Sequence, residues 1–153
     1  MALAVSELAD LDCVLLLWAT NPLIPEALRV AEAWGFRYVT KFPWIKLSGP
    51  PQVNFLGEWE YKPNYGVGFW ARGCSEDVFI CRRGNVSPPE LGWVGILSEC
   101  FFHSRKPDNI YEFAESMPGP YLELFARRPR PGWDIWGNQI ESTIQIGAEQ
   151  VTP

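Results

Sequence analysis

The chain has 153 residues, of which 13 are Lys or Arg and 18 are Asp or Glu, so its formal net charge is −5. This balance excludes a nucleic-acid binder that works through bulk positive charge, although it leaves room for a local basic patch. Hydrophobic residues make up 47% of the sequence, enough for one domain with a real core. Its 8 Trp indicate that some rings line a cleft for a flat ligand.

Neither the cysteines nor the N-terminus point to a metal site or to a membrane. The 4 Cys form no C-x-x-C pair and only 1 His accompanies them, so no metal site is expected. The N-terminal segment lacks the features of a signal peptide, and the longest apolar run, Cys13 to Ala19, is too short to cross a bilayer. We expect a soluble, cytoplasmic protein that has no membrane partner.

The first third of the chain predicts a strand, a helix and a second strand. The apolar run from Cys13 to Ala19 is typical of a strand buried on both faces. A turn at Asn21-Pro22 leads into a helix that ends at Gly35. Residues Arg37 to Lys46 are rich in β-branched and aromatic types, which favour a strand, and Pro43 within it indicates an edge or a bulge.

The middle of the chain predicts a long loop followed by short strands. Residues Leu47 to Gly68 show no periodicity, and we expect this loop to gate access of the substrate. Asp77 to Arg82 predicts a strand that pairs with Arg37–Lys46 as a wide hairpin, and Val94 to Cys100 predicts another short strand.

The last third predicts a helix, two strands and a tail. The helix begins near Pro107, and strands follow at Tyr121–Ala126 and Trp133–Trp136. Strands and helices therefore alternate, which predicts a three-layer α/β domain over residues 1–140 and a C-terminal tail over residues 141–153. Such folds bind ligands beyond the carboxyl ends of their parallel strands.

Two polar segments are candidates for ligand binding. Basic and amide side chains from Arg127 to Gln139 follow the Tyr121–Ala126 strand and suit the hydroxyls or the carboxylate of a nucleoside ligand, with Phe125 and Trp136 flanking a ring. Spacing alone favours a simpler interpretation, in which this segment is a basic, solvated turn that caps a core strand. The helix entry at Lys106 suits an anionic group, and ordinary capping explains it as well.

Five sequence segments, taken in order, resemble one family. They are LLLWATNPLIPEAL, AWGFRYVTKFPWIK, GFWARGCSEDVFICRRG, HSRKPDNIYE and PGPYLELFARRPRPGWDIWGNQ. Together they resemble the adenine N(6)-methyltransferases that include the mRNA adenosine methyltransferase and many bacterial and phage enzymes, and they extend to Gln139. The resemblance implies a Rossmann-like methyltransferase sheet, mostly parallel with an antiparallel hairpin, that binds S-adenosylmethionine.

The resemblance also assigns site residues by position. The residues matched to the cofactor side are Lys106, Glu123, Phe125, Arg127, Arg130, Asn138 and Gln139. The residues matched to the methyl-acceptor side are Trp44, Lys46, Glu76 and Ser104.

The family's catalytic Asp-Pro-Pro-Trp is absent from these 153 residues, so no catalytic residue is assigned. In the family, its Asp and a backbone carbonyl accept hydrogen bonds from the adenine amino group and localise its lone pair, and its Pro and Trp shape the base pocket. Family members carry the motif upstream of the segment matched by Leu3–Leu15, so we expect one central N-terminal strand to be missing. Three interpretations follow: a truncated enzyme, a chain completed by a partner or swapped segment, and a degenerate paralogue.

The function implied is methyl transfer to the exocyclic amino group of adenine in DNA or RNA, with a non-catalytic cofactor-binding or scaffold subunit as the alternative. The adenine is expected to be flipped or single-stranded, because its amino group is paired inside a duplex. A local patch is expected to grip the nucleic acid, and a homo- or hetero-oligomer is possible. The patch comprises Arg72, Arg82, Arg83, Arg105, Arg127, Arg128 and Arg130.

Overall fold

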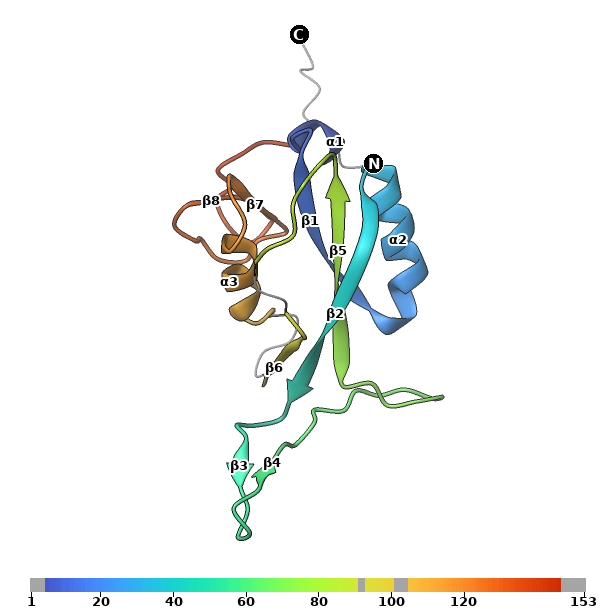
Figure 1. Ribbon diagram of the computed structural model, residues 1–153, viewed down its shortest axis with the longest axis vertical. Coiled ribbons are helices and arrows are strands. Elements are labelled where there is room, and N and C mark those ends of the chain that lie inside the picture. Colours follow the sequence, from blue (N-terminus) through green and yellow to red (C-terminus); the bar gives the residue numbers. More distant parts are fainter. Residues whose placement is uncertain (1–4, 91–92, 101–104, 147–153) are drawn as a thin grey trace.

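The computed structural model describes residues 5–90, 93–100 and 105–146 (Figure 1). The helices are α1 (Val5–Leu8), the 3-10 helix η1 (Asn21–Leu23), α2 (Ile24–Ala33) and α3 (Asn109–Glu115). The strands are β1 (Cys13–Thr20), β2 (Arg37–Leu47), β3 (Gln52–Val53), β4 (Trp59–Glu60), β5 (Ser75–Arg83), β6 (Ile96–Glu99), β7 (Tyr121–Leu124) and β8 (Trp133–Trp136).

The main sheet has four strands in the order β1-β5-β2-β6. Strand β5 runs antiparallel to both of its neighbours, whereas β6 runs parallel to β2. Strands β1, β2 and β6 therefore point the same way, and β5 alone runs against them. The expected hairpin between the segments 37–46 and 77–82 is confirmed, whereas the pairing of β5 with β1 along its whole length was not predicted.

Each face of the main sheet is covered, which gives the expected three layers (Figure 1). Helix α2 buries Ala27 and Ala31 against Phe79 and Cys81 of β5 on one face. Helix α3 buries apolar side chains, including Phe113, on the other face, where the core also holds residues of β2, β5 and β6. The Rossmann-like α/β class is thus confirmed as a mixed sheet between helical layers.

Strands β7 and β8 form a separate parallel pair on the α3 side. Within the described residues neither pairs with β1, and β1 has a strand on only one of its edges. Most of β1 is therefore half-buried, although its sequence predicts a strand buried on both faces. The family resemblance assigns a further strand to the position between β1 and the β7–β8 pair.

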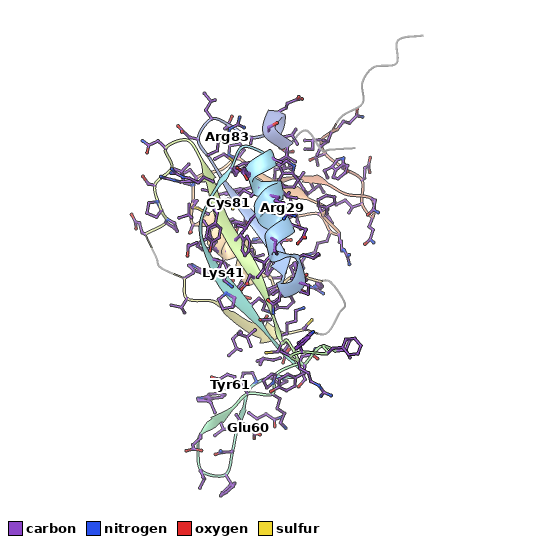
Figure 2. All side chains as sticks on the ribbon, turned by 90° about the vertical axis from the view of Figure 1, so that its right-hand side faces the viewer. Arg29, Lys41, Glu60, Tyr61, Cys81 and Arg83 are labelled. Carbon is purple, nitrogen blue, oxygen red and sulfur yellow. The ribbon has the colours of Figure 1, made fainter. Side chains whose placement is uncertain are left out.

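The segment expected as a loop from Leu47 to Gly68 contains structure of its own. Strands β3 and β4 pair through Gln52 with Glu60 and Val53 with Trp59, and they form a hairpin that projects from the end of the main sheet (Figure 1). Figure 2 shows Glu60 and Tyr61 on this arm, away from the body that holds Cys81. Period-two alternation over two residues is too short to be detected in a sequence.

Other boundaries differ from the sequence predictions by a few residues. Strand β7 ends at Leu124, because Phe125 adopts the left-handed conformation with φ 63°. Pro43 pairs only with β5, since the pairing of β2 with β6 begins at Trp44. In the segment expected as a tail, Thr143 bonds back to β8: its backbone N–H donates to the carbonyl oxygen of Ile135 at 2.9 Å.

No helix in the described ranges is long and apolar enough to cross a membrane.

The close approach of β7 and β8 yields a stability prediction. A Cβ on Gly137 would lie 2.2 Å from the Ala126 carbonyl oxygen, so Gly137→Ala must push the two strand ends apart. We expect it to lower the free energy of unfolding by about 1–3 kcal/mol, the usual cost of overpacking. Denaturant titration followed by Trp fluorescence measures this. Gly49→Ala is the control, because nothing lies within 4 Å of its new Cβ. Equal stabilities for the two variants would contradict the prediction.

Candidate active site

The carboxyl ends of β1, β2 and β6 lie at the same edge of the main sheet as the amino end of β5. In the register of the sheet, Glu76 near the start of β5 pairs with Thr20 of β1 and with Trp44 of β2. The antiparallel strand thus places an acid between the ends of two parallel strands. This is the edge at which α/β proteins bind their ligands.

Two lysines hold the carboxylate of Glu76, and we call these three residues the Glu76 cluster. Lys46 Nζ of β2 donates to Glu76 Oε1 at 2.5 Å, and Lys106 Nζ, from the segment before α3, donates to the other oxygen, Oε2. Glu76 is 8% exposed, so its charge is largely removed from water. A buried carboxylate requires such partners, because an unpaired one carries a large desolvation cost.

The charges of the lysines decide the protonation of Glu76. Burial by itself raises the pKa of this carboxyl, but the hydrogen bonds and charges of Lys106 and Lys46 outweigh it. The pKa of Glu76 therefore lies below its ordinary value, and the group is ionised at neutral pH.

Two tryptophan rings flank the cluster. Trp18 of β1 and Trp44 of β2 meet edge to face, with their ring centroids 5.7 Å apart. Lys106 Nζ lies 4.9 Å from the Trp18 centroid, and Lys46 Nζ lies 4.9 Å from that of Trp44, so both ammonium groups also make cation–π contacts. Trp44 Nε1 donates to Ser98 Oγ at 2.9 Å and thereby fixes its indole.

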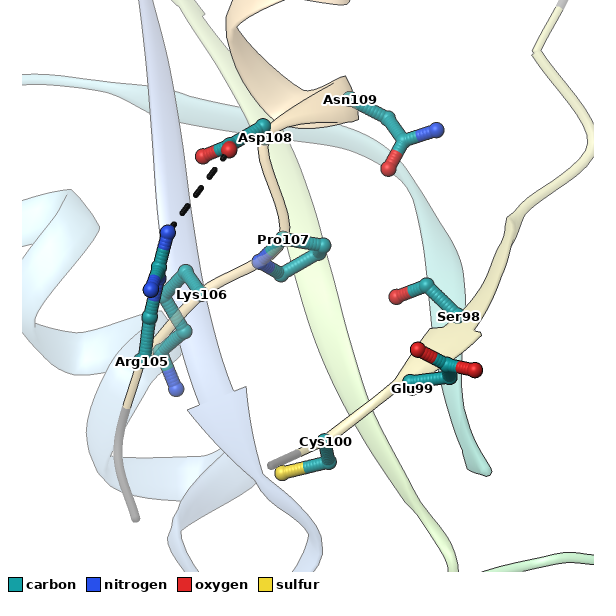
Figure 3. A pocket seen from close by; sticks show the side chains of 8 residues that line it. All are labelled: Ser98, Glu99, Cys100, Arg105, Lys106, Pro107, Asp108 and Asn109. Atoms are coloured by element: carbon teal, nitrogen blue, oxygen red, sulfur yellow. Dashed lines mark ion pairs between the residues drawn. The ribbon is translucent and has the colours of Figure 1, made fainter. Parts of the chain in front are cut away.

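A hollow of about 330 Å³ adjoins the cluster (Figure 3). Its walls are the end of β6 and the segment that leads into α3. They comprise Ser98, Glu99, Cys100, Arg105, Lys106, Pro107, Asp108 and Asn109. Lys106 and Ser98 belong both to these walls and to the contacts around Glu76 and Trp44, so the hollow and the Glu76 cluster form one site.

The ends of β7 and β8 lie beside the same hollow. These strands are parallel, so the residues that follow them emerge together, and Arg128 forms an ion pair with Asp108 of the hollow wall. The exposed residues at these ends are Phe125, Arg127, Asn138 and Gln139. Phe125 meets Trp136 edge to face with centroids 5.5 Å apart. The two strand ends thus present a guanidinium, two amides and an aromatic ring on one side of the site.

Glu123 of β7 points instead to α3, where Tyr111 Oη donates to its carboxylate at 2.9 Å. Burial raises the pKa of Glu123, and the hydrogen bond from Tyr111 only partly offsets this. Burial and the Glu123 charge also raise the pKa of Tyr111 well above its usual range. The pair joins β7 to α3 within the third layer.

Arg130 is held on the same side of the layer as Glu123. Its guanidinium donates two hydrogen bonds of 2.8 Å each to Glu115, which also accepts one from Trp133 Nε1, and it stacks 4.3 Å from the Tyr111 centroid. Hydrogen bonds from Trp133 and Arg130 lower the pKa of Glu115. These contacts give Arg130 a structural role in the described chain.

The structure gathers most of the residues predicted for the site into two groups. The predicted residues Trp44, Lys46, Glu76 and Lys106 meet in one cluster, although only the last of them was assigned to the cofactor side. The residues at the ends of β7 and β8 form the second group, and Glu123 and Arg130 face α3. Ser104 lies outside the described residues.

Sequence analysis assigned no role in the site to Trp18 or to Tyr111. Trp18 stands at the end of an apolar strand, and the only available signal was its position just before Thr20-Asn21. Tyr111 lies on the apolar stripe of α3, where nothing in the sequence distinguishes it from a core residue.

The arrangement can hold a planar polar molecule. The ring of Trp18, which is partly exposed, offers apolar surface, Glu76 can accept hydrogen bonds from an amino group, and the lysines can donate to ring nitrogens or oxygens. Beyond α3, the amides and the guanidinium at the β7–β8 ends can bond hydroxyls or a carboxylate.

Comparison with known proteins identifies relatives that match most of the chain. The profile of the MT-A70 family matches residues 1–139. The chain is 28% identical over 145 residues to the human N(6)-adenine-specific methyltransferase METTL4, a match that covers 89% of this chain and 30% of that protein. It is 29% identical over 143 residues to the type II methyltransferase M.MunI of Mycoplasma sp, a match that covers 88% of this chain and 54% of that protein.

A fungal protein is similar to the same degree. The N6-methyladenosine RNA methyltransferase MTA1 of Cryphonectria parasitica is 30% identical over 139 residues, and the match covers 84% of this chain and 38% of that protein. The chain thus spans between about a third and about a half of the length of these curated relatives.

The lowered pKa of Glu76 yields a pH prediction. A carboxyl whose pKa is lower in the folded state stabilises the fold above its unfolded pKa, about 4.3, and loses that contribution as the pH falls through its folded pKa. We expect Glu76→Gln to be about 1–3 kcal/mol less stable than the native chain at pH 7, and the difference to shrink below about pH 4. Urea titrations at a series of pH values measure this. Glu60→Gln, at an exposed position on β4, should match the native chain throughout. A pH-independent difference for Glu76→Gln would refute the prediction.

Proposed function

The chain belongs to the MT-A70 family, and we propose that it is the cofactor-binding and acceptor-shaping part of an enzyme that methylates the exocyclic amino group of adenine in nucleic acid. One observation carries the proposal most directly. The Glu76 cluster adjoins one hollow at the carboxyl edge of the sheet through Lys106, and the polar end of β7 adjoins the same hollow through the Arg128–Asp108 ion pair.

S-adenosylmethionine is the proposed methyl donor, and the side chains at the β7–β8 ends fit its chemistry. Arg127 can bind a carboxylate through two parallel N–H groups. The amides of Asn138 and Gln139 can bond ribose hydroxyls or an adenine edge. Gly137 lets the two strand ends approach closely, so these exposed groups emerge side by side. Bound there, the cofactor supplies an electrophilic methyl group.

The acceptor side requires groups that orient the adenine amino group. Its nitrogen is a poor nucleophile, because the lone pair is delocalised into the ring. Trp18, which is partly exposed, can contact the flat base, and the Glu76 carboxylate, which two lysines hold, can accept a further hydrogen bond from a polar edge of the substrate. Positioning and preorganised hydrogen-bond acceptors are the main contributions that a protein makes to such a displacement.

The acceptor is proposed to be an unpaired or flipped adenine of DNA or RNA. Among the relatives, MTA1 is named an N6-methyladenosine RNA methyltransferase, whereas M.MunI is named only a type II methyltransferase. Arginines near the hollow, Arg105 and Arg128, are candidates for phosphate contacts, and the hairpin arm is the candidate gate. Burial and the neighbouring charges of Arg105 and Arg130 lower the pKa of Arg128, which is consistent with a crowded cationic surface.

A second candidate is a non-catalytic, cofactor-binding subunit of such an enzyme. The observation on which it rests is that all the residues assigned to the cofactor side lie within these 153 residues. Both candidates require the β7–β8 ends to bind the cofactor, and they differ only in methyl transfer.

Calorimetric titration with S-adenosylhomocysteine tests the cofactor site. We expect binding by the native chain and a loss of affinity of ten-fold or more for Asn138→Ala, since a good hydrogen bond in a site contributes about 1.5 kcal/mol. Asn85→Ala is the matched control, because this exposed asparagine follows the far end of β5. Equal losses in the two variants, or no binding to the folded chain, would contradict the cofactor assignment.

Methyl transfer to adenine-containing oligonucleotides separates the two candidates. We expect transfer when the chain is joined to a family segment that carries Asp-Pro-Pro-Trp, and at least ten-fold less for Glu76→Gln than for Glu60→Gln in that protein. The readout is radioactive methyl incorporation. Cofactor binding without transfer in the joined protein would reject the enzyme and leave the non-catalytic subunit.

A further inference from the structure

The segment from Tyr61 to Gly73, which we call the 61–73 loop, carries exposed aromatic side chains. Phe69 and Trp70 are fully exposed, and Tyr65 is more than half exposed. Large apolar side chains exposed in this way carry a hydration cost, which a ligand that covers them would relieve. The loop begins at the base of the β3–β4 hairpin, and Figure 1 shows its outer part extending sideways from the end of the main sheet.

The tip of this loop is a tight turn. A Cβ on Gly68 would lie 2.1 Å from the Ala71 carbonyl oxygen, so the backbone between these residues doubles back on itself. At the loop's base, the N–H of Gly66 donates to the carbonyl oxygen of Gly73 at 2.8 Å. The turn therefore presents Phe69 and Trp70 together at its outer end.

The base of the loop is fixed to the candidate active site. The N–H of Asn64 donates to the carbonyl oxygen of Lys46, and the N–H of Lys46 donates to the carbonyl oxygen of Cys74, each at 2.7 Å. Both bonds involve the backbone of Lys46, whose side chain donates to Glu76. The exposed rings thus extend from the rim of the site.

The charge of the loop differs from that of the chain. Residues 61–73 contain Lys62 and Arg72 and no Asp or Glu, whereas the whole chain has a net charge of −5. The acids of the arm, Glu58 and Glu60, precede the loop. Exposed rings beside isolated cations suit a ligand that offers flat faces and negative charge at short intervals.

We propose that the 61–73 loop is a stacking platform for a single-stranded nucleic acid, which binds the nucleotides next to the adenine that enters the site. This inference rests on the proposed function. Bases stack on Phe69 and Trp70, and Arg72 contacts the backbone phosphates. Stacking tolerates any base, so the platform binds strands without fixing their sequence. It also explains how a chain of negative net charge can grip nucleic acid, because most of the affinity then comes from rings rather than from bulk charge.

Fluorescence anisotropy with a labelled single strand of nucleic acid tests the platform. The strand has about 15 nucleotides, which is near the upper end of the site sizes of single-strand binders. The double variant Phe69→Ala/Trp70→Ala removes the rings, and Phe69→Tyr/Trp70→Phe keeps two aromatic rings. Val67→Ala is the control, since it removes an exposed apolar group from the same loop. Titration with S-adenosylhomocysteine, run on every variant, reports on the cofactor site independently.

We expect the double alanine variant to bind the strand at least ten-fold more weakly than the native chain does. The variant that keeps two aromatic rings and Val67→Ala should both bind within about two-fold of the native chain. A duplex of the same length should bind to the native chain more weakly than the single strand does. Unchanged binding by the double alanine variant would overturn the platform while leaving the proposed function intact. Absence of strand binding to a native chain that binds S-adenosylhomocysteine would also overturn it. A native dimer that the double alanine substitution dissociates, seen by light scattering, would assign the rings to a second copy of the chain instead.

Discussion

The buried carboxylate of Glu76 imposes the constraint on which the site depends. A charge that is 8% exposed requires partners, and the two that it has come from different layers. Lys46 belongs to the main sheet, whereas Lys106 precedes α3 on one face of it. Satisfying one acid thus fixes the entry of α3 against the ends of β1 and β2. The hollow between β6 and that entry exists because this contact holds its two walls in position.

The next residue of β5, Asp77, is also a buried acid paired with a lysine, and it lies on the opposite face of the sheet. Asp77 is 4% exposed and forms an ion pair with Lys41 of β2 at 2.5 Å. Successive residues of a strand point to opposite faces, so adjacent acids need separate lysines, and β2 supplies one for each. The antiparallel β5 is therefore polar at its amino end and apolar through Val78 and Phe79, where it crosses the core. This division explains how one strand can serve both the site and the fold.

The sequence predicted the elements that are long and periodic, together with the residues that meet at Glu76. The strand at 37–46, its pairing with 77–82 and the helices near Pro25 and Pro107 follow from local patterns. The position of β5 between β1 and β2 did not follow, because strand order depends on contacts distant in sequence. The ion pair of Arg130 with Glu115 could not be predicted either, because a cation in a basic run can bind a ligand or an acid on a neighbouring helix equally well.

The β3–β4 arm joins the body through a narrow base. The N–H of Ser48 donates to the carbonyl oxygen of Lys62 at 2.9 Å, so the chain leaves and re-enters the body at almost the same point. Residues 49–61 are therefore inserted at one position in the body of the protein. A longer or shorter arm at this position changes the loop-closure entropy only slightly. Evolution can therefore lengthen, shorten or exchange this arm without disturbing the residues around Glu76. Family members with the same chemistry can in this way acquire different appendages.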